Sequence, residues 1–217
     1  MVIELNEKAK EFIERSFRLL KEKVILKVFI SRERRRCLYC YEVVDLTTKI
    51  ANLSDLVSVK VLDMGEERSI AERYSINMVP AILVHSNKEY GVRFFGVPVG
   101  YEFKSLIEDI IDVSRGKVDL SQNVRRLIEP IAKRVHIRVF VTPACPYCPF
   151  VVRAAHKFAI LNRNITADMI ESYEFPELAD KYEVLAVPKI VINDVIKLEG
   201  AFPEIYFAQK ILEALGE

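Results

Sequence analysis

Apolar and polar residues alternate along this chain with two different periods. Charged residues interrupt Ile, Leu and Phe at helical spacing over about residues 6–20 and 121–133, which predicts an amphipathic helix in each segment. A run of mainly β-branched residues follows each segment, at Val24–Ile30 and Val135–Val141, and predicts a buried strand. Helices and strands in alternation predict an α/β fold.

The same order of elements continues after both predicted strands. Apolar positions at helical intervals predict a helix of about four turns, followed by a second strand, a short charged helix and a Val-Pro dipeptide. The dipeptide leads into two short strands whose connecting turn residues predict an antiparallel hairpin, and a final helix ends the unit. We predict second strands at 56–62 and 165–170, hairpin strands at 81–85 and 189–193, and closing helices at about 102–114 and 203–215.

The chain contains an internal duplication. A shift of 108 residues places Cys37-Leu38-Tyr39-Cys40 on Cys145-Pro146-Tyr147-Cys148, and Val79-Pro80 on Val187-Pro188. Between these motifs, apolar residues of one copy fall on apolar residues of the other. Chance rarely preserves cysteines, prolines and apolar positions together over such a distance. We therefore predict two tandem units, residues 1–117 and 118–217, each with a mixed central sheet flanked by helices. The first unit has a longer loop before its motif, at 31–36, and a longer hairpin.

Composition narrows the classes of function. The 217 residues carry 32 Lys and Arg against 31 Asp and Glu, so the net charge of +1 predicts no general attraction to nucleic acid or to an anionic membrane. No apolar run approaches the roughly 18 residues that span a bilayer. Charges interrupt the apolar residues of the first 23 positions, so no signal peptide is predicted and we expect a cytoplasmic location. The scarcity of glutamine, the absence of tryptophan and the abundant charge of both signs are typical of heat-adapted proteins.

The four cysteines are the only ones in the chain, and they form two CxxC pairs. If the first cysteine of a pair opens a helix, the second lies one turn further on, near enough to close a disulfide ring. The free N–H groups and the dipole at the helix start then favour the thiolate of the first cysteine. A thiolate with a second thiol one turn behind it can attack a disulfide and resolve the mixed disulfide, which is thiol–disulfide exchange.

Two other uses of CxxC pairs compete with exchange. Structural zinc also takes thiolates at this spacing, but zinc ribbons place the second pair about 15–20 residues after the first. Here 104 residues separate Cys40 from Cys145, and each pair lies at the same place in a duplicated unit. Static disulfides are a poor alternative because so small a ring stabilises a fold little. Redox chemistry without a metal or an organic cofactor is therefore the favoured interpretation.

The order strand, CxxC, helix, strand, helix, Pro, hairpin, helix resembles the thioredoxin fold. Cys145-Pro146-Tyr147-Cys148 matches the motif of glutaredoxins, and two such units in tandem resemble the archaeal and thermophilic protein disulfide oxidoreductases, also called glutaredoxin-like proteins. The resemblance covers essentially the whole chain. It implies that Cys37 and Cys145 are nucleophiles and that Cys40 and Cys148 are resolving thiols.

The resemblance also implies a substrate groove beside each motif. Pro80 and Pro188 match the family's cis-proline, which points the backbone of Val79 and Val187 toward an extended substrate segment. Tyr39, Pro146 and Tyr147, inside the two motifs, are further candidates for contact with substrate. The partners implied are protein disulfides and dithiols, together with a flavoprotein electron donor of the thioredoxin-reductase type. No nucleic acid and no membrane is expected among them.

Two alternatives to a general disulfide oxidoreductase stay open. One is an electron-carrying reductase that is fed by a flavoprotein and serves a peroxidase, and the other is a holdase that binds unfolded chains without catalysis. Two departures from the family matter as well. The buried acid that thioredoxins carry on the strand before the motif has no counterpart in either predicted strand, and the first motif has Leu38 where glutaredoxins have proline.

Overall fold

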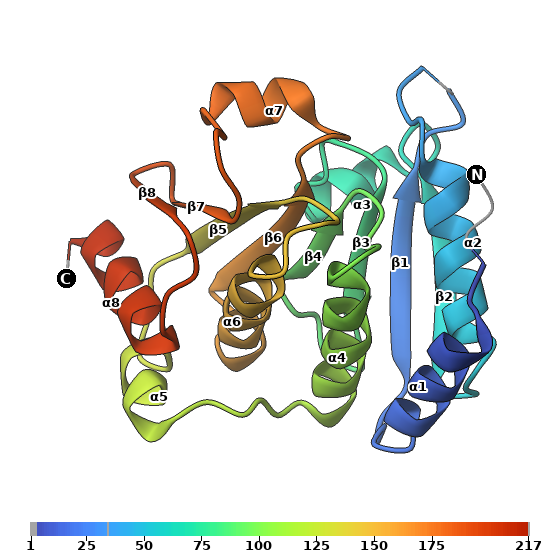
Figure 1. Cartoon of the computed structure of the whole chain (residues 1–217), viewed down its shortest axis with the longest axis horizontal. Helices are drawn as coiled ribbons and strands as arrows, with labels where there is room; N and C mark the ends of the chain where they lie inside the picture. Colours follow the sequence, from blue (N-terminus) through green and yellow to red (C-terminus); the bar gives the residue numbers. More distant parts are fainter. Residues whose placement is uncertain (1–3, 34, 217) are drawn as a thin grey trace.

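The computed structural model describes residues 4–33 and 35–216, and its centre is one eight-stranded sheet. The strands lie in the order β2-β1-β3-β4-β6-β5-β7-β8, so each half of the chain contributes four neighbouring strands (Figure 1). In each half the first two strands pair in parallel and the last two form the antiparallel hairpin that the sequence predicts. The division of the chain at 117/118 stays a prediction.

The predicted order of elements is found in both units. The first unit consists of α1 Glu7–Phe17, β1 Val24–Ile30, α2 Cys40–Ala51, β2 Val57–Asp63, α3 Arg68–Arg73, β3 Ala81–His85, β4 Val92–Phe95 and α4 Glu102–Arg115. The second consists of α5 Gln122–Ile128, β5 Val135–Val141, α6 Cys148–Leu161, β6 Ile165–Glu171, α7 Pro176–Lys181, β7 Lys189–Ile192, β8 Ile196–Glu199 and α8 Glu204–Leu215.

The helix expected over 121–133 is too long by more than a turn. It ends at Ile128 because Pro130 has no N–H to continue the helical hydrogen bonds, although Glu129 still has helical backbone angles (φ −58°, ψ −40°). The side-chain amide of Asn162 then donates to the carbonyls of Ile128 and Ile131, 2.8 and 2.9 Å away. A buried amide from another element thus replaces the hydrogen bonds that a longer helix would have made.

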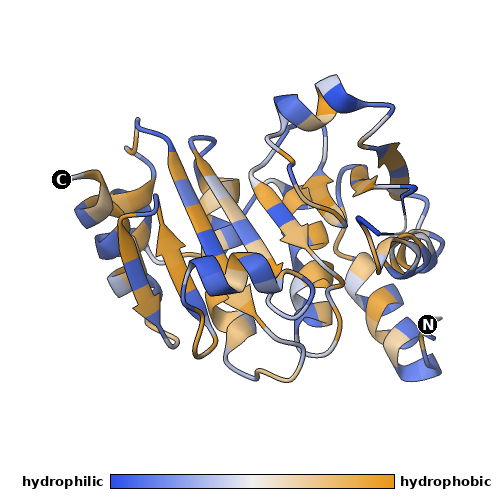
Figure 2. Cartoon of the chain, turned by 90° about the horizontal axis from the view of Figure 1, so that it is seen from above, coloured by the Kyte–Doolittle hydropathy of each residue, from blue (hydrophilic) through white to orange (hydrophobic). Residues whose placement is uncertain are grey.

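The two faces of the sheet are covered unequally. Side chains from α1, α2, α4, α5, α6 and α8 pack with one set of strand residues into the larger hydrophobic core. Among the described helices, the short α3 and α7 cover the other face, over a smaller core that contains Phe29, Phe95 and Phe140. Apolar and polar positions alternate along several strands (Figure 2), as expected where only one face is fully covered.

The units share one sheet, whereas the sequence predicted a sheet for each. Strands β4 and β6 pair in parallel, with Val92 opposite Ala167 and Phe95 opposite Ile170. Gly91 permits this contact, because a Cβ there would lie 2.2 Å from the carbonyl oxygen of Ile165. The closing helix α4 of the first unit packs beside α6 of the second, so the first unit reaches the second unit's CxxC helix (Figure 1).

Candidate active site

Each CxxC pair forms its own disulfide. Cys37 is bonded to Cys40 and Cys145 to Cys148, with Cα–Cα distances of 5.5 Å in both pairs. Each pair follows the carboxyl end of the strand that pairs with two neighbours, β1 or β5, where open α/β sheets carry their sites. All four cysteines are buried.

The helices begin at the second cysteine of each motif and not at the first. Tyr39 and Tyr147 are the N-cap residues of α2 and α6, so the first cysteine lies just before the helix start. At the second site, the backbone N–H of Cys148 points to Cys145 Sγ, 3.1 Å away. At the first site, the N–H of Ser31 instead points to Cys40 Sγ at 3.4 Å. Among the described residues, a helix-start N–H faces the sulfur of the first cysteine, here called the outer sulfur, only at the second site.

Each motif faces its Val-Pro segment. The Val79–Pro80 and Val187–Pro188 peptide bonds are both cis, as the family resemblance predicts. Cys145 Sγ lies 3.8 Å from the carbonyl oxygen of Val187, and Val79 packs in the same cluster as Cys37 and Cys40. Pro80 and Pro188 are buried. The structure thus brings the predicted cysteines and their Val-Pro segments together in both units.

The groove in front of the first site is built by both units. A cavity of about 1020 Å³ is lined by Leu38, Tyr39, Val79 and Pro80 and, on its far side, by residues 173–176 of the second unit. Glu174 fastens that far side, because its carboxylate accepts from the backbone N–H of Val97 at 2.7 Å. Sequence reasoning missed this wall, since nothing local predicts that a loop after β6 reaches the other unit's motif.

The candidate substrate contacts within the motifs are exposed side chains. Tyr39 and Tyr147 are 40% and 64% exposed, and Pro146 is exposed as well. Arg34 of the loop before Cys37 lies outside the described residues, whereas Arg35 and Arg36 are exposed.

A buried carboxyl group lies beside the second motif and comes from the first unit. Glu102, the first residue of α4, is 1% exposed. The N–H of its neighbour Tyr101 donates to the Pro143 carbonyl at 3.1 Å, which fixes the start of α4 beside the loop that leads to Cys145. Two turns further along α4, Asp109 accepts from His156, which is two turns past Cys148 on α6, at 2.6 Å. The helices therefore run parallel, and Glu102 is level with the first turn of α6.

Glu102 is not satisfied by hydrogen bonds. Neither of its carboxylate oxygens makes a hydrogen bond of normal geometry with the described residues. Burial raises the pKa of Glu102 to about 7, while the neighbouring Ser105 hydroxyl and the charges of His156 and Arg153 act in the opposite direction. Sequence reasoning could not indicate this buried carboxyl group, because it lies 43 residues before Cys145 in the other unit.

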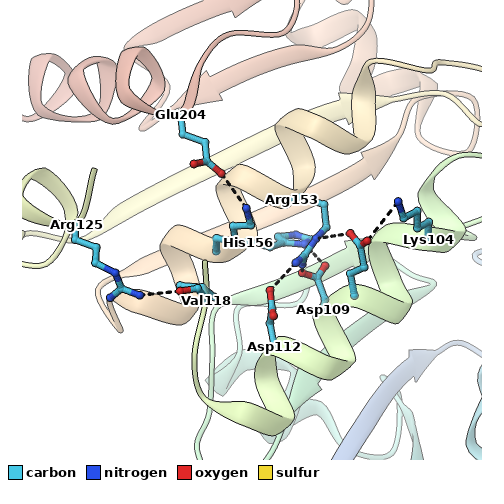
Figure 3. A network of polar contacts seen from close by, with 10 residues as sticks. Lys104, Asp109, Asp112, Val118, Arg125, Arg153, His156 and Glu204 are labelled. Atoms are coloured by element: carbon cyan, nitrogen blue, oxygen red, sulfur yellow. Dashed lines mark hydrogen bonds and ion pairs between the residues drawn. The ribbon is translucent and has the colours of Figure 1, made fainter. Parts of the chain in front are cut away.

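Further along α4 than Glu102, ion pairs join this helix to α6. Arg153 donates to Asp109, to Asp112 at 2.5 Å and to Glu108 at 3.2 Å (Figure 3). His156 is fully buried, and burial lowers its pKa to about 3. His156 is therefore a neutral imidazole packed inside the fold.

Replacing Glu102 by glutamine should change how stability depends on pH. A carboxyl whose pKa is about 7 in the folded chain, against 4.5 ordinarily, holds its proton more tightly when folded. The wild-type chain therefore loses stability as pH rises between these values, by about 3 kcal/mol if each pKa unit is worth about 1.4 kcal/mol. Glutamine cannot ionise, so Glu102→Gln should not lose this stability as pH rises. In chemical denaturation, the stability of the variant minus that of wild type should therefore be larger at pH 8 than at pH 5.

The matched control is Glu204→Gln. Glu204 occupies the corresponding first position of α8, but it is partly exposed and paired with Lys157 at 2.9 Å. Its substitution should leave the slope between pH 5 and pH 8 unchanged. Equal slopes for wild type and Glu102→Gln would show that Glu102 does not titrate in this window.

Neither a metal site nor a membrane-spanning helix is found among the described residues. No group of three His, Cys, Asp or Glu within 4–33 and 35–216 is placed to hold a metal ion. In the same part of the chain, no helix is both long and apolar enough to cross a membrane.

Comparison with known proteins agrees with this geometry. The thioredoxin domain family matches residues 135–213. The chain is 32% identical over 67% of its length to the F subunit of alkyl hydroperoxide reductase from Staphylococcus aureus, and 26% identical over 89% to NADH dehydrogenase from Bacillus subtilis. It spans only 28% and 35% of the length of these two relatives.

Solved structures extend the similarity to nearly the whole chain. A protein disulfide oxidoreductase from Aeropyrum pernix is 28% identical and superimposes with a TM-score of 0.89, covering 98% of this chain and 94% of its own. The NTD_N/C domain of alkyl hydroperoxide reductase AhpF from Enterococcus faecalis gives the same TM-score at 23% identity and shows the shared fold.

Proposed function

We propose that this chain, a thiol–disulfide oxidoreductase with two tandem thioredoxin-like units, exchanges disulfides with protein substrates at both of its CxxC sites. The observation that carries the proposal is the pair of disulfides, each closed within one motif at the start of a helix. The similarity to the Aeropyrum pernix protein disulfide oxidoreductase over nearly the whole chain supports it.

In the reducing direction, the thiolate of Cys145 or Cys37 attacks a substrate disulfide. One substrate sulfur leaves as a thiol, and a mixed disulfide joins enzyme and substrate. Cys148 or Cys40 then loses its proton, attacks the mixed disulfide and releases the second substrate thiol. In the oxidising direction, a substrate thiolate attacks the enzyme disulfide and the same steps run in reverse.

The residues around the sulfurs have separate roles in this scheme. The N–H of Cys148 stabilises negative charge on Cys145 Sγ, because hydrogen bonds to an ionised group are roughly twice as strong as neutral ones. The backbone of Val187, which lies beside the same sulfur, is positioned to pair with an extended substrate segment. Glu102, level with the first turn of α6, is the carboxyl group that we propose to take the proton of Cys148 at the second site.

The proposal is tested with the dithiol form of the full chain and insulin. Reduced wild type should transfer electrons to insulin disulfides and precipitate the B chain. A variant with all four cysteines replaced by serine should cause no more precipitation than buffer alone. A separate assay with a thermally unfolding client tests the holdase alternative. If reduced wild type failed to reduce insulin while wild type and the four-serine variant protected the client equally, exchange would be excluded and binding alone would account for the activity.

A second function is favoured by one specific similarity. The relative at 32% identity belongs to an alkyl hydroperoxide reductase, so we propose as the alternative an electron carrier between a flavoprotein and a peroxidase. The two functions share their chemistry and differ in reduction potential. A potential near that of thioredoxin, about −270 mV, would favour the carrier, and one well above it would favour an oxidase or isomerase. A cytoplasmic location and a thermophilic source stay predictions of the sequence.

A further inference from the structure

Equivalent positions beside the two sites carry different chemistry. Phe150, two residues after Cys148, is 69% exposed, whereas its counterpart Glu42 is buried. Leu185, two residues before Val187, is 91% exposed, and its counterpart in the first unit is the exposed Asn77. The residue before the first cysteine is Ala144 in the second unit and Arg36 in the first. Two sites with the same fold therefore present different surfaces to a substrate.

Arginines line the rim of the first groove. Arg32, Arg35, Arg36 and Arg68 all line its cavity, and all four are exposed. Arg35 makes no ion pair or hydrogen bond with the described residues. The other three pair mainly with exposed carboxylates on the same surface, at Glu66, Glu33 and Glu72. Such exposed pairs are worth about 0–1 kcal/mol, so an incoming carboxylate can compete for these guanidinium groups.

Of the three described carboxylates that line this groove, Glu33 pairs with Arg36, and the other two accept hydrogen bonds from the backbone. Asp63 accepts from the N–H groups of Gly65 and Arg32, at 2.8 and 3.0 Å. Glu174 accepts from Val97, and its pKa is raised to about 7 by burial, so part of it is neutral near pH 7. The groups that remain free to meet a substrate are mainly guanidinium groups.

The second site presents exposed apolar side chains, as the first does at Leu38 and Tyr41, but no arginine stands in the loop before its first cysteine. Tyr147, Phe150 and Leu185 are exposed by 64%, 69% and 91%, and they belong to the motif helix and to the segment that approaches Cys145. The loop before Cys145 is Thr142-Pro143-Ala144 and carries no charge. Large apolar side chains gathered at a reactive group, and left in water, indicate a contact surface for an apolar partner.

We infer that the two sites divide substrates by the residues next to the disulfide: the first site takes segments that carry Asp or Glu, and the second takes segments with large apolar side chains. This inference rests on the proposed exchange activity. At either site the chemistry is the same. The enzyme dithiol gives two electrons and two protons to the substrate disulfide, which leaves as a dithiol, while the enzyme disulfide forms.

The expected preferences differ in size and in salt dependence. Exposed ion pairs of up to about 1 kcal/mol predict that the first site prefers an acidic segment by roughly 3- to 5-fold at low salt, and that the preference shrinks as salt screens the charges. One apolar side chain in a fitted pocket is worth about 10-fold or more, so we expect roughly 5- to 10-fold at the open second site. Salt should leave that second preference unchanged.

The test uses two synthetic peptides with the same disulfide ring, flanked either by Glu or by Leu and Phe. Two full-length variants isolate the sites: Cys145→Ser/Cys148→Ser leaves the first, and Cys37→Ser/Cys40→Ser leaves the second. Each variant is reduced, freed of reductant and mixed with an oxidised peptide, and single-turnover rates are measured at low and high salt. The first-site variant should favour the acidic peptide at low salt, and the second-site variant the apolar peptide at both.

Surface substitutions then assign each preference to its residues. Arg35→Glu in the first-site variant should abolish the acidic preference, and Leu185→Asn in the second-site variant should lower the apolar preference several-fold. Val195→Asn, which changes an apolar residue that is 69% exposed in the β7–β8 turn, is the matched control and should change nothing. Equal peptide ratios at both sites would overturn the division of substrates. Failure of both variants to reduce either peptide would instead refute the exchange activity itself.

Discussion

Cys145→Ser should remove most of the disulfide exchange, whereas Cys37→Ser should leave a substantial part of it. The reason is the environment of the outer sulfur. At the second site the helix-start N–H of Cys148 lies 3.1 Å from Cys145 Sγ, whereas at the first site the N–H of Ser31, in the loop after β1, points to Cys40 Sγ. A hydrogen bond to a charged group contributes about 1.5–3 kcal/mol, so this N–H stabilises the thiolate of Cys145 relative to that of Cys37.

Access to the two sulfurs differs in the same direction. Pro146 fixes the backbone just before α6 begins, and the short uncharged loop before Cys145 leaves the motif open. At the first site, the longer arginine-bearing loop and residues 173–176 of the second unit border the groove. A bulky folded substrate should therefore reach the second site more easily.

The measurement compares both serine variants in insulin reduction and in the refolding of a scrambled substrate. We expect about a tenfold loss for Cys145→Ser, the factor that 1.4 kcal/mol represents, and less than about a threefold loss for Cys37→Ser. Cys40→Ser and Cys148→Ser serve as matched controls, since they stop at the mixed disulfide and trap substrate at the corresponding site. Equal losses at the two sites, or a larger loss at Cys37, would contradict the ranking.

Local patterns in the sequence were sufficient to predict most of the elements and both motifs. Each helix and strand buries an apolar face whose period is visible in one short segment, and the duplication provides two independent examples of each element. The pairing of each cysteine with its Val-Pro segment followed from the family resemblance, and the structure places them together. The catalytic roles of these residues stay predictions.

The contacts between units could not be predicted in this way. The pairing of β4 with β6 joins residues about 75 positions apart, and a strand's own pattern does not specify its neighbour. Glu102 looks like any acidic residue in the first turn of a helix, where such residues are favoured by the dipole. Only the packing of α4 against α6 reveals that it is buried beside the second motif.

The buried ion cluster at this junction explains how polar residues are accommodated inside the sheet. Arg93 on β4 donates to Asp168 on β6 at 2.6 and 2.8 Å, and His136 on β5 lies 2.6 Å from the same carboxylate. Arg93 also donates to the carbonyl of Tyr74 at 2.8 Å. Burial opposes ionisation of Asp168, but the charge of Arg93 and the hydrogen bonds from His136 and Arg93 outweigh it and lower its pKa to about 2.

Asp168→Ala should therefore be among the most destabilising single changes in the chain. It leaves the guanidinium of Arg93, which is 7% exposed, buried without its counterion, and such a loss costs about 3–5 kcal/mol. Glu72→Ala is the matched control, because it removes the partner of Arg68 from a carboxylate that is 65% exposed, and it should cost at most about 1 kcal/mol. Equilibrium denaturation of the three proteins measures the difference.

The same ion cluster predicts a dependence on pH and a route to rescue. Because the pKa of Asp168 is depressed, its contribution is complete above its unfolded value of about 3.9 and is lost as pH falls toward 2. The stability deficit of Asp168→Ala should accordingly shrink in acid.

The double variant Arg93→Met/Asp168→Leu removes both charges and keeps similar volume, and replacement of a buried pair by apolar residues is often neutral or stabilising. Recovery of most of the lost stability would assign the loss to the unpaired charge of Arg93. A double variant as unstable as Asp168→Ala would show instead that the shape of this junction, and not its charge, holds the two units in one sheet.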